Sequence, residues 1–172
     1  MLEPAFHERL LTILRPIYQD LDGISREADL ERVARIARSL THPTRELELL
    51  LLFYPAAKWM EKPRNFSRVA LAGGIGEDEL RAIMASIRRL SLPRTHEERA
   101  VAAAILIDAS GVRGLAQAFA HARREGRSLS DVAREAMSDN TIPEWMTDQA
   151  AEMLEERLRA RRAFCEALLR EV

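Results

Sequence analysis

Cysteine, lysine and long apolar runs are scarce in this sequence, and the scarcity of cysteine and of apolar runs excludes whole classes of structure. Cys165 is the single cysteine, so the chain can form no internal disulfide and no zinc site built from several cysteines. Its neighbours Phe164 and Leu168 are apolar, and we therefore expect Cys165 to be a small buried residue. Apolar runs such as Leu49–Tyr54 are far shorter than the roughly 20 residues of a membrane-spanning helix, so we expect no membrane partner.

The N-terminus and the overall charge narrow the class further. The first residues, MLEPAFHERL, lack the basic region and long apolar stretch of a signal peptide, so we expect a cytoplasmic protein. The formal net charge is −1, from 26 basic and 27 acidic residues, whereas a non-specific nucleic-acid binder is usually clearly basic. A nucleic-acid partner is therefore not expected. A chain of 172 residues with 47% hydrophobic content is typical of one globular domain and not of a disordered chain.

The scarcity of lysine means that the basic residues are almost all arginine. Lys58 and Lys62 stand against 24 arginines. Codon bias in a GC-rich genome is the simplest explanation of this excess. The functional alternative is a surface or pocket that holds phosphate or carboxylate, because a guanidinium binds both groups through two parallel hydrogen bonds.

The residues that are abundant favour helices. Alanine, leucine, arginine and glutamate dominate, and β-branched residues are sparse. Apolar residues recur every three or four positions, as in the stripe Leu30, Val33, Ala34, Ala37 and Leu40. The sequence therefore predicts an all-α protein, a compact single-domain helical bundle over residues 1–172 that ends in a long amphipathic helix. The expected helices are Ala5–Asp20, Arg26–Leu40, Thr44–Tyr54 with an imperfect continuation to Met60, Glu77–Leu90, His96–Asp108, Leu115–Arg124, Asp131–Met137 and Asp148–Glu171.

Local signals place some of the helix ends. Thr95 followed by Glu98 is the pattern of a capping box, which opens a helix. Pro16 is expected to kink the first helix or to end it early, because proline lacks the backbone N–H. On that first helix, the residues expected to face inward are Phe6, Leu10, Ile13, Leu14 and Ile17.

Glycine and proline predict two interruptions in the helical pattern. Residues 61–76 carry a proline and three glycines, so we expect a loop there with a short helix over Phe66–Leu71. Gly111 and Gly114 are expected to separate two helices. Both interruptions are short, so neither predicts a linker between domains.

The motifs of common metal and phosphate sites are missing. The four histidines, His7, His42, His96 and His121, include no pair at i, i+4 and no HExxH motif, and we expect them at the surface or at its boundary with the core. The stretch Ala72–Glu77 contains three glycines, but no lysine–serine or lysine–threonine pair follows. It is therefore predicted to be a turn and a helix entry and not a phosphate-binding loop.

Several segments carry a resemblance in their order and spacing. They are Asp29–Ala37, Leu49–Trp59, Ile87–Thr95, Ile105–Val112, Trp145–Thr147 and Glu155–Arg157. Over about residues 25–172, this pattern resembles the HD-domain phosphohydrolases, which are helical metal-dependent enzymes named after a histidine–aspartate pair. The resemblance is to the small single-domain members of this family, which have a DAD-type motif and a long C-terminal helix. The resemblance implies the same helical fold.

The metal ligands of that family are replaced at the matching positions. In family order these positions hold Asp29, Tyr54 with Pro55 (or Phe53 with Tyr54), Leu90 and Ser110. Only Asp108, the first aspartate of the DAD-type motif, is kept. Tyrosine, proline and leucine offer no suitable donor at neutral pH, and without a metal nothing activates water or clamps a phosphoryl group. The resemblance therefore implies the fold, whereas the residues argue against the activity.

We thus expect a catalytically inactive relative that acts as a binding or regulatory module. Its former active-site cleft would bind a small anionic ligand or would have closed. The candidate ligand-binding residues are Tyr54, Asp108, Arg68, Arg88, Arg89 and Arg113. No cofactor is expected, because Asp29 and Asp108 together could hold at most a weakly bound, mostly hydrated Mg²⁺.

Two alternatives stay open at this point. The first is a metal-dependent phosphohydrolase that acts on nucleotides or other phosphoesters with a rebuilt site. Such a site would combine Asp29 and Asp108 with His42 or His96. The second is a structural helical protein that works through homodimerisation by an apolar helix face.

Overall fold

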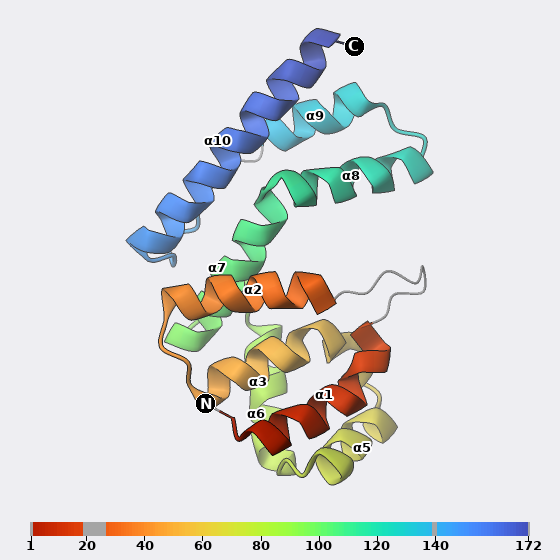
Figure 1. Cartoon of the computed structure of the whole chain (residues 1–172), viewed down its shortest axis with the longest axis vertical. Coiled ribbons are helices and arrows are strands. Elements are labelled where there is room, and N and C mark those ends of the chain that lie inside the picture. Colours follow the sequence, from red (N-terminus) through yellow and green to blue (C-terminus); the bar gives the residue numbers. More distant parts are fainter. Residues whose placement is uncertain (1, 19–26, 139–140, 172) are drawn as a thin grey trace. The chain divides into compact units, whose positions relative to one another are not determined.

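The structure, a computed structural model of the chain, describes residues 2–18, 27–138 and 141–171. Within these ranges the protein is helical and contains no strand (Figure 1), which confirms the all-α prediction. The chain forms two compact units, Met1–Ala102 and Ala103–Val172. The single-domain organisation stays a prediction.

The first unit is built around α3, a helix that is buried from Leu47 to its end at Phe53. Its elements are α1 (Pro4–Tyr18), α2 (Glu27–Leu40), α3 (Arg45–Phe53), the 3₁₀ turn η1 (Tyr54–Ala56), α4 (Ala57–Met60), α5 (Pro63–Gly73), α6 (Glu77–Arg88) and the first part of α7 (His96–Ser110). Every residue from Leu47 to Phe53 is buried, because α1, α2 and α6 all pack against α3. The side chain of Thr44 accepts a hydrogen bond from the backbone N–H of Leu47 and so caps this helix.

The first helix differs from its prediction in two respects. Phe6, Leu10 and Leu14 are buried as expected. Tyr18 is buried as well, whereas Ile13 and Ile17 are only half-buried. The helix continues past Pro16 to Tyr18. Because the proline lies in the last turn, its missing N–H costs only one backbone hydrogen bond. The expected end at Asp20 and the expected start of the next helix at Arg26 lie outside the described residues.

The segment predicted to be mainly loop contains a longer helix than expected. We predicted a short helix over Phe66–Leu71, whereas α5 runs from Pro63 to Gly73. Proline at the first helical position costs no hydrogen bond, since that N–H has no partner within a helix. Gly74 ends the helix with φ +68°, a left-handed conformation that glycine adopts without strain. The imperfect continuation from α3 through η1 and α4 to Met60 is confirmed.

The predicted capping box at the start of α7 is confirmed. Thr95 Oγ1 accepts from the Glu98 N–H at 3.1 Å, and Glu98 Oε2 accepts from the Thr95 N–H at 3.3 Å. The same carboxylate accepts from the Arg94 N–H at 2.7 Å and pairs with Arg89 at 2.6 Å, although its side chain is 0% exposed. Burial raises the pKa of Glu98, but its hydrogen bonds to Arg94, Arg89, Ser86 and Thr95 outweigh burial and hold the pKa below the ordinary value of 4.5.

The lowered pKa predicts an acid-dependent loss of stability. Because the folded-state pKa of Glu98 is depressed, its stabilisation is fully present above about pH 4.5 and is lost as the pH falls through the lower, folded value. Glu98→Gln removes this titration, so the difference in unfolding free energy between the parent and this variant should shrink between about pH 7 and about pH 3. Urea denaturation followed by circular dichroism measures that difference.

The comparison is best made with Glu46→Gln present in both the parent and the Glu98→Gln variant, so that the titration of Glu46 does not contribute to the difference. Burial, followed by the carboxylates of Glu97 and Glu98, raises the pKa of Glu46, so this group adds a slope of opposite sign. A difference between the two proteins that stays constant down to about pH 3 would contradict the assigned role of the Glu98 carboxylate.

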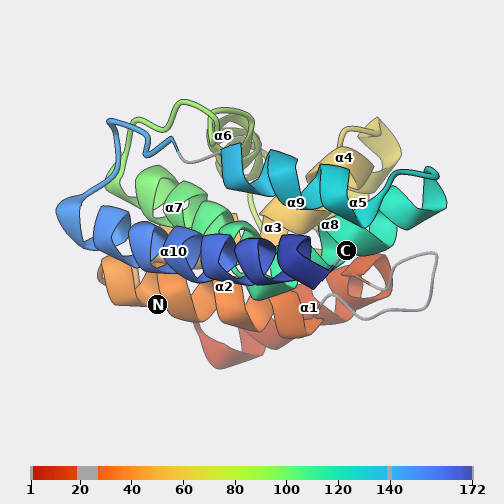
Figure 2. The ribbon, with the colours of Figure 1, turned by 90° about the horizontal axis from the view of Figure 1, so that it is seen from above.

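The second unit holds the rest of α7 together with three more helices. These are α8 (Val112–Arg124), α9 (Leu129–Ser138) and α10 (Asp148–Glu171), and α10 has the bounds that the sequence predicted. The helices α8 and α9 both pack against α10 (Figures 1 and 2). Cys165 is fully buried with Leu115 and Ala133, which confirms its prediction as a small core residue, and burial raises the pKa of its thiol.

Of the two glycines that were expected to separate α7 from α8, only Gly111 does so. Gly111 is the N-cap of α8, whereas Gly114 lies inside the first turn of that helix, contrary to the prediction. A Cβ atom at Gly114 would lie 1.8 Å from the carbonyl oxygen of Ala109, so glycine is needed there for close backbone packing and not for a break. No single helix among the described residues is long and apolar enough to cross a membrane, although the bent pair α7 and α8 passes that test together by length and composition.

Candidate functional site

The predicted binding residues of the first unit are spread over several elements. Tyr54 opens η1 and is half-buried, Arg68 is exposed on α5, and Arg88 is exposed at the end of α6. Arg89 directly follows α6, and its guanidinium is bound to the buried carboxylate of Glu98. Arg89 therefore supports the start of α7 through this ion pair.

Two further predicted residues belong to the second unit. Asp108 is half-buried near the end of α7, and Arg113 is exposed at the start of α8. The six predicted residues are thus divided between the two units, and their common cleft stays a prediction.

The residues considered for a rebuilt metal site do not all lie on one element of the structure. Asp29 lies on α2 and forms an ion pair with Arg32 at 2.9 Å. His42 lies in the loop before α3, His96 opens α7, and both are exposed. Across residues 2–18, 27–138 and 141–171, no three His, Cys, Asp or Glu side chains form a group that could hold a metal ion.

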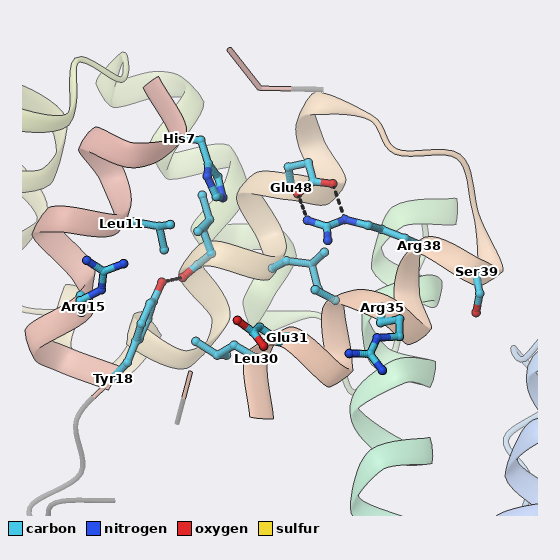
Figure 3. A pocket seen from close by; sticks show the side chains of 13 residues that line it. His7, Leu11, Arg15, Tyr18, Leu30, Glu31, Arg35, Arg38, Ser39 and Glu48 are labelled. Carbon is cyan, nitrogen blue, oxygen red and sulfur yellow. Dashed lines mark hydrogen bonds and ion pairs between the residues drawn. The ribbon is translucent and has the colours of Figure 1, made fainter. Parts of the chain in front are cut away.

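A cavity of about 680 Å³ lies between α1, α2 and α3 of the first unit (Figure 3). The α1 wall consists of His7, Leu11, Arg15 and Tyr18, whose spacing of three or four residues places them on one face of the helix. This volume lies within the range of pockets that bind small organic molecules. None of the six predicted binding residues lines it.

The other sides of the cavity come from α2 and α3. From α2 come Leu30, Glu31, Ala34, Arg35, Arg38 and Ser39, and from α3 come Glu48, Leu51 and Leu52. The apolar stripe predicted on α2 is therefore divided: Val33 and Ala37 are buried, whereas Leu30 and Ala34 are half-buried and border the cavity. The base is apolar, because Leu51 and Leu52 of the central helix are both buried there.

An ion pair closes one part of the cavity wall. Arg38 donates from Nε to Glu48 Oε1 at 2.8 Å and from Nη2 to Oε2 at 2.6 Å, so the two groups meet in the fork-to-fork geometry. The side chain of Glu48 is only 9% exposed, and that of Arg38 is 47% exposed. The hydrogen bonds to Glu48 raise the pKa of Arg38, and the pair ties α2 to α3 beside His7, as Figure 3 shows.

Tyr18 closes the cavity at the end of α1. Its ring is buried, and its hydroxyl donates to the backbone carbonyl of Leu52 at 2.6 Å (Figure 3). A buried tyrosine with a satisfied hydroxyl keeps an apolar ring in place without a desolvation cost. This contact fixes the distance between α1 and α3 at the cavity.

Sequence reasoning missed this cavity, because four of its thirteen lining residues lie on a helix outside the resemblance. The resemblance begins near residue 25, whereas α1 covers Pro4–Tyr18. One signal was present: the cavity-facing residues of α1 form a mixed stripe beside the apolar one, with His7 and Arg15 among them. Such a stripe indicates a partly wet helix face, but only the packing of α2 shows that this face borders a cavity.

Comparison of the chain with protein-family models, with curated proteins and with solved structures finds no match. The relationship to the HD-domain phosphohydrolases therefore stays a prediction.

Proposed function

We propose that this protein is a binding module without a catalytic role, and that the cavity between α1, α2 and α3 is its ligand site. The observation that carries this proposal is the cavity itself, with a volume of about 680 Å³, an apolar base and a polar rim. The non-catalytic role is the one that the resemblance implies, because the metal ligands of that family are replaced in this chain. The proposed ligand site, however, is this cavity and not the former active-site cleft that the resemblance predicts.

Incomplete burial of apolar side chains supports the proposal. Leu11, Leu30 and Ala34 are half-buried and face the cavity from two helices, above the buried leucines of α3. An apolar group placed against them removes their remaining surface from water, which stabilises the complex by about 25 cal/mol per Å². A ligand with an apolar body is therefore favoured over a wholly polar one.

The position of the cavity also supports a regulatory consequence of binding. A ligand there contacts three helices that follow one another in the sequence, and it would hold α1 and α2 against the central helix. Because such a ligand binds only the folded unit, it raises the free energy of unfolding by an amount that grows with its concentration. An increase of the melting temperature on ligand addition is thus part of the expected behaviour.

Ala34→Trp is expected to weaken binding strongly, because an indole on α2 would occupy part of the cavity that Ala34 lines. The probe is N-phenylnaphthylamine, a neutral aromatic molecule whose fluorescence rises in apolar sites. The parent protein should bind one probe per chain, and the variant should bind it at least about tenfold more weakly. Fluorescence titration measures both affinities, and circular dichroism checks that the variant keeps its helices.

The matched control is Ala28→Trp, because Ala28 lies on the same helix, is exposed and does not line the cavity. A second pair uses α1: Leu11→Trp enters the cavity, whereas Thr12→Trp lies on the exposed side of that helix. Equal binding by the cavity variants and their controls would overturn the proposal, and so would a parent protein that binds no probe.

The two alternatives remain predictions with tests of their own. Stoichiometric metal in the purified protein together with phosphoester hydrolysis would favour the phosphohydrolase with a rebuilt site. A molar mass by light scattering that corresponds to two chains would favour the homodimer.

A further inference from the structure

The charged groups around the cavity differ in how they are paired. They are His7 and Arg15 on α1, Glu31, Arg35 and Arg38 on α2, and Glu48 on α3. Arg38 and Glu48 neutralise each other through their two hydrogen bonds. This pair therefore contributes little net charge to the site, and the remaining charges decide which ligand is favoured.

Arg35 is the cationic group left available on the α2 wall. Within the described part of the chain its guanidinium forms no hydrogen bond and no ion pair. Glu31 stands four residues earlier on the same helix, a spacing that permits an ion pair, yet no such pair joins them and no dashed line connects them in Figure 3. All N–H donors of Arg35 thus remain free for a ligand at the rim of the cavity.

We propose that the cavity takes an amphipathic monoanion. Its apolar body lies over Leu51 and Leu52 between the walls of α1 and α2, and its single acidic group, a carboxylate or a phosphodiester, is bound by Arg35. This inference rests on the proposed function of the cavity and adds the chemical class of the ligand.

Electrostatics limits the ligand to one negative charge. The carboxylate of Glu31 lies one helical turn from Arg35 on the same wall, and the neutralised Arg38–Glu48 pair adds no net positive charge there. A polyphosphate or dicarboxylate would place its further negative charges near the Glu31 carboxylate, and like charges repel. A fatty-acid-like or aromatic monocarboxylate meets the guanidinium of Arg35 and avoids that repulsion.

The test compares two probes that share one apolar body. Anilinonaphthalene sulfonate carries a single negative charge, whereas N-phenylnaphthylamine carries none. Arg35→Gln should weaken binding of the sulfonate by about tenfold, because a charge-assisted hydrogen bond is lost, and should leave binding of the neutral probe unchanged. The matched control is Arg64→Gln, which removes one exposed arginine on α5, outside the cavity, and so changes the net charge equally.

Displacement of the sulfonate probe by dodecanoate and by dodecyl phosphate compares a monoanionic head group with a more highly charged one. At neutral pH the phosphate ester carries more negative charge, so dodecanoate should displace the probe at the lower concentration. Tighter binding of dodecyl phosphate would overturn the restriction to a monoanion. Equal effects of Arg35→Gln and Arg64→Gln on the sulfonate probe would overturn the role of Arg35.

Failure of this inference is distinguishable from failure of the proposed function. If the neutral probe binds and is excluded by Ala34→Trp, while the sulfonate probe ignores Arg35→Gln, the cavity binds apolar ligands and the anion inference is wrong. If neither probe responds to Ala34→Trp, the cavity is not the binding site and both proposals are wrong.

Discussion

Glu98→Ala is expected to lower the free energy of unfolding by about 2–3 kcal/mol. The carboxylate of Glu98 has no exposed surface, yet it accepts hydrogen bonds from the backbone of Arg94 and Thr95 and from the guanidinium of Arg89. Alanine removes this acceptor and leaves the three donors without it. The Nε of Arg89 is already buried without a partner, and loss of Glu98 leaves its Nη2 with only the hydroxyl of Ser86 as a side-chain acceptor.

Urea denaturation at neutral pH measures this loss of stability, and Asp78→Ala is its control. Asp78 is also a carboxylate in the first turn of a helix, α6, but its side chain is 99% exposed and pairs with Arg81 at the surface. Surface pairs of this kind contribute at most about 1 kcal/mol, so the control should change little. Losses of similar size in the two variants would show that the buried network is not what stabilises the start of α7.

The capping box was predictable from the sequence because it is a local motif. Its two side chains bond backbone groups within the same turn, so Thr95 and Glu98 are sufficient to recognise it. The ends of α10 were predictable for the same reason, since a regular amphipathic pattern fills Asp148–Glu171. The burial of Glu98 and its pairing with Arg89 were not predictable, because they depend on the packing of α6 against the capped turn.

The candidate site shows where sequence reasoning ends. The resemblance directed attention to Asp29 and Tyr54, which stand close in sequence to Leu30 and Leu52 of the cavity but do not line it. Periodicity identified Leu30 and Ala34 as apolar positions, yet it could not show that space remains beside them. A cavity is a property of how three helices pack, and the sequence pattern of each helix alone is the same whether that space is filled or empty.

Gly114→Ala is the second substitution with a large expected effect, a loss of about 3 kcal/mol of unfolding free energy. An added Cβ would lie 1.8 Å from the carbonyl oxygen of Ala109 and 2.5 Å from its carbonyl carbon. These are backbone atoms in the last turn of α7, so no side-chain rotation can relieve the overlap. The close approach of α8 to the end of α7 must open, although alanine is otherwise the better helix former.

Gly111→Ala provides the control at the same corner. A Cβ at Gly111 would meet the side chain of Arg157 and the carbonyl of Asp108 at 3.6 Å, which is ordinary contact, and its φ of −77° suits any residue. We expect Gly111→Ala to change the unfolding free energy by less than about 1 kcal/mol. Thermal and urea unfolding measure both variants. If Gly114→Ala lowered the unfolding free energy as little as Gly111→Ala does, the assignment of a close backbone contact between α7 and α8 at Gly114 would be wrong.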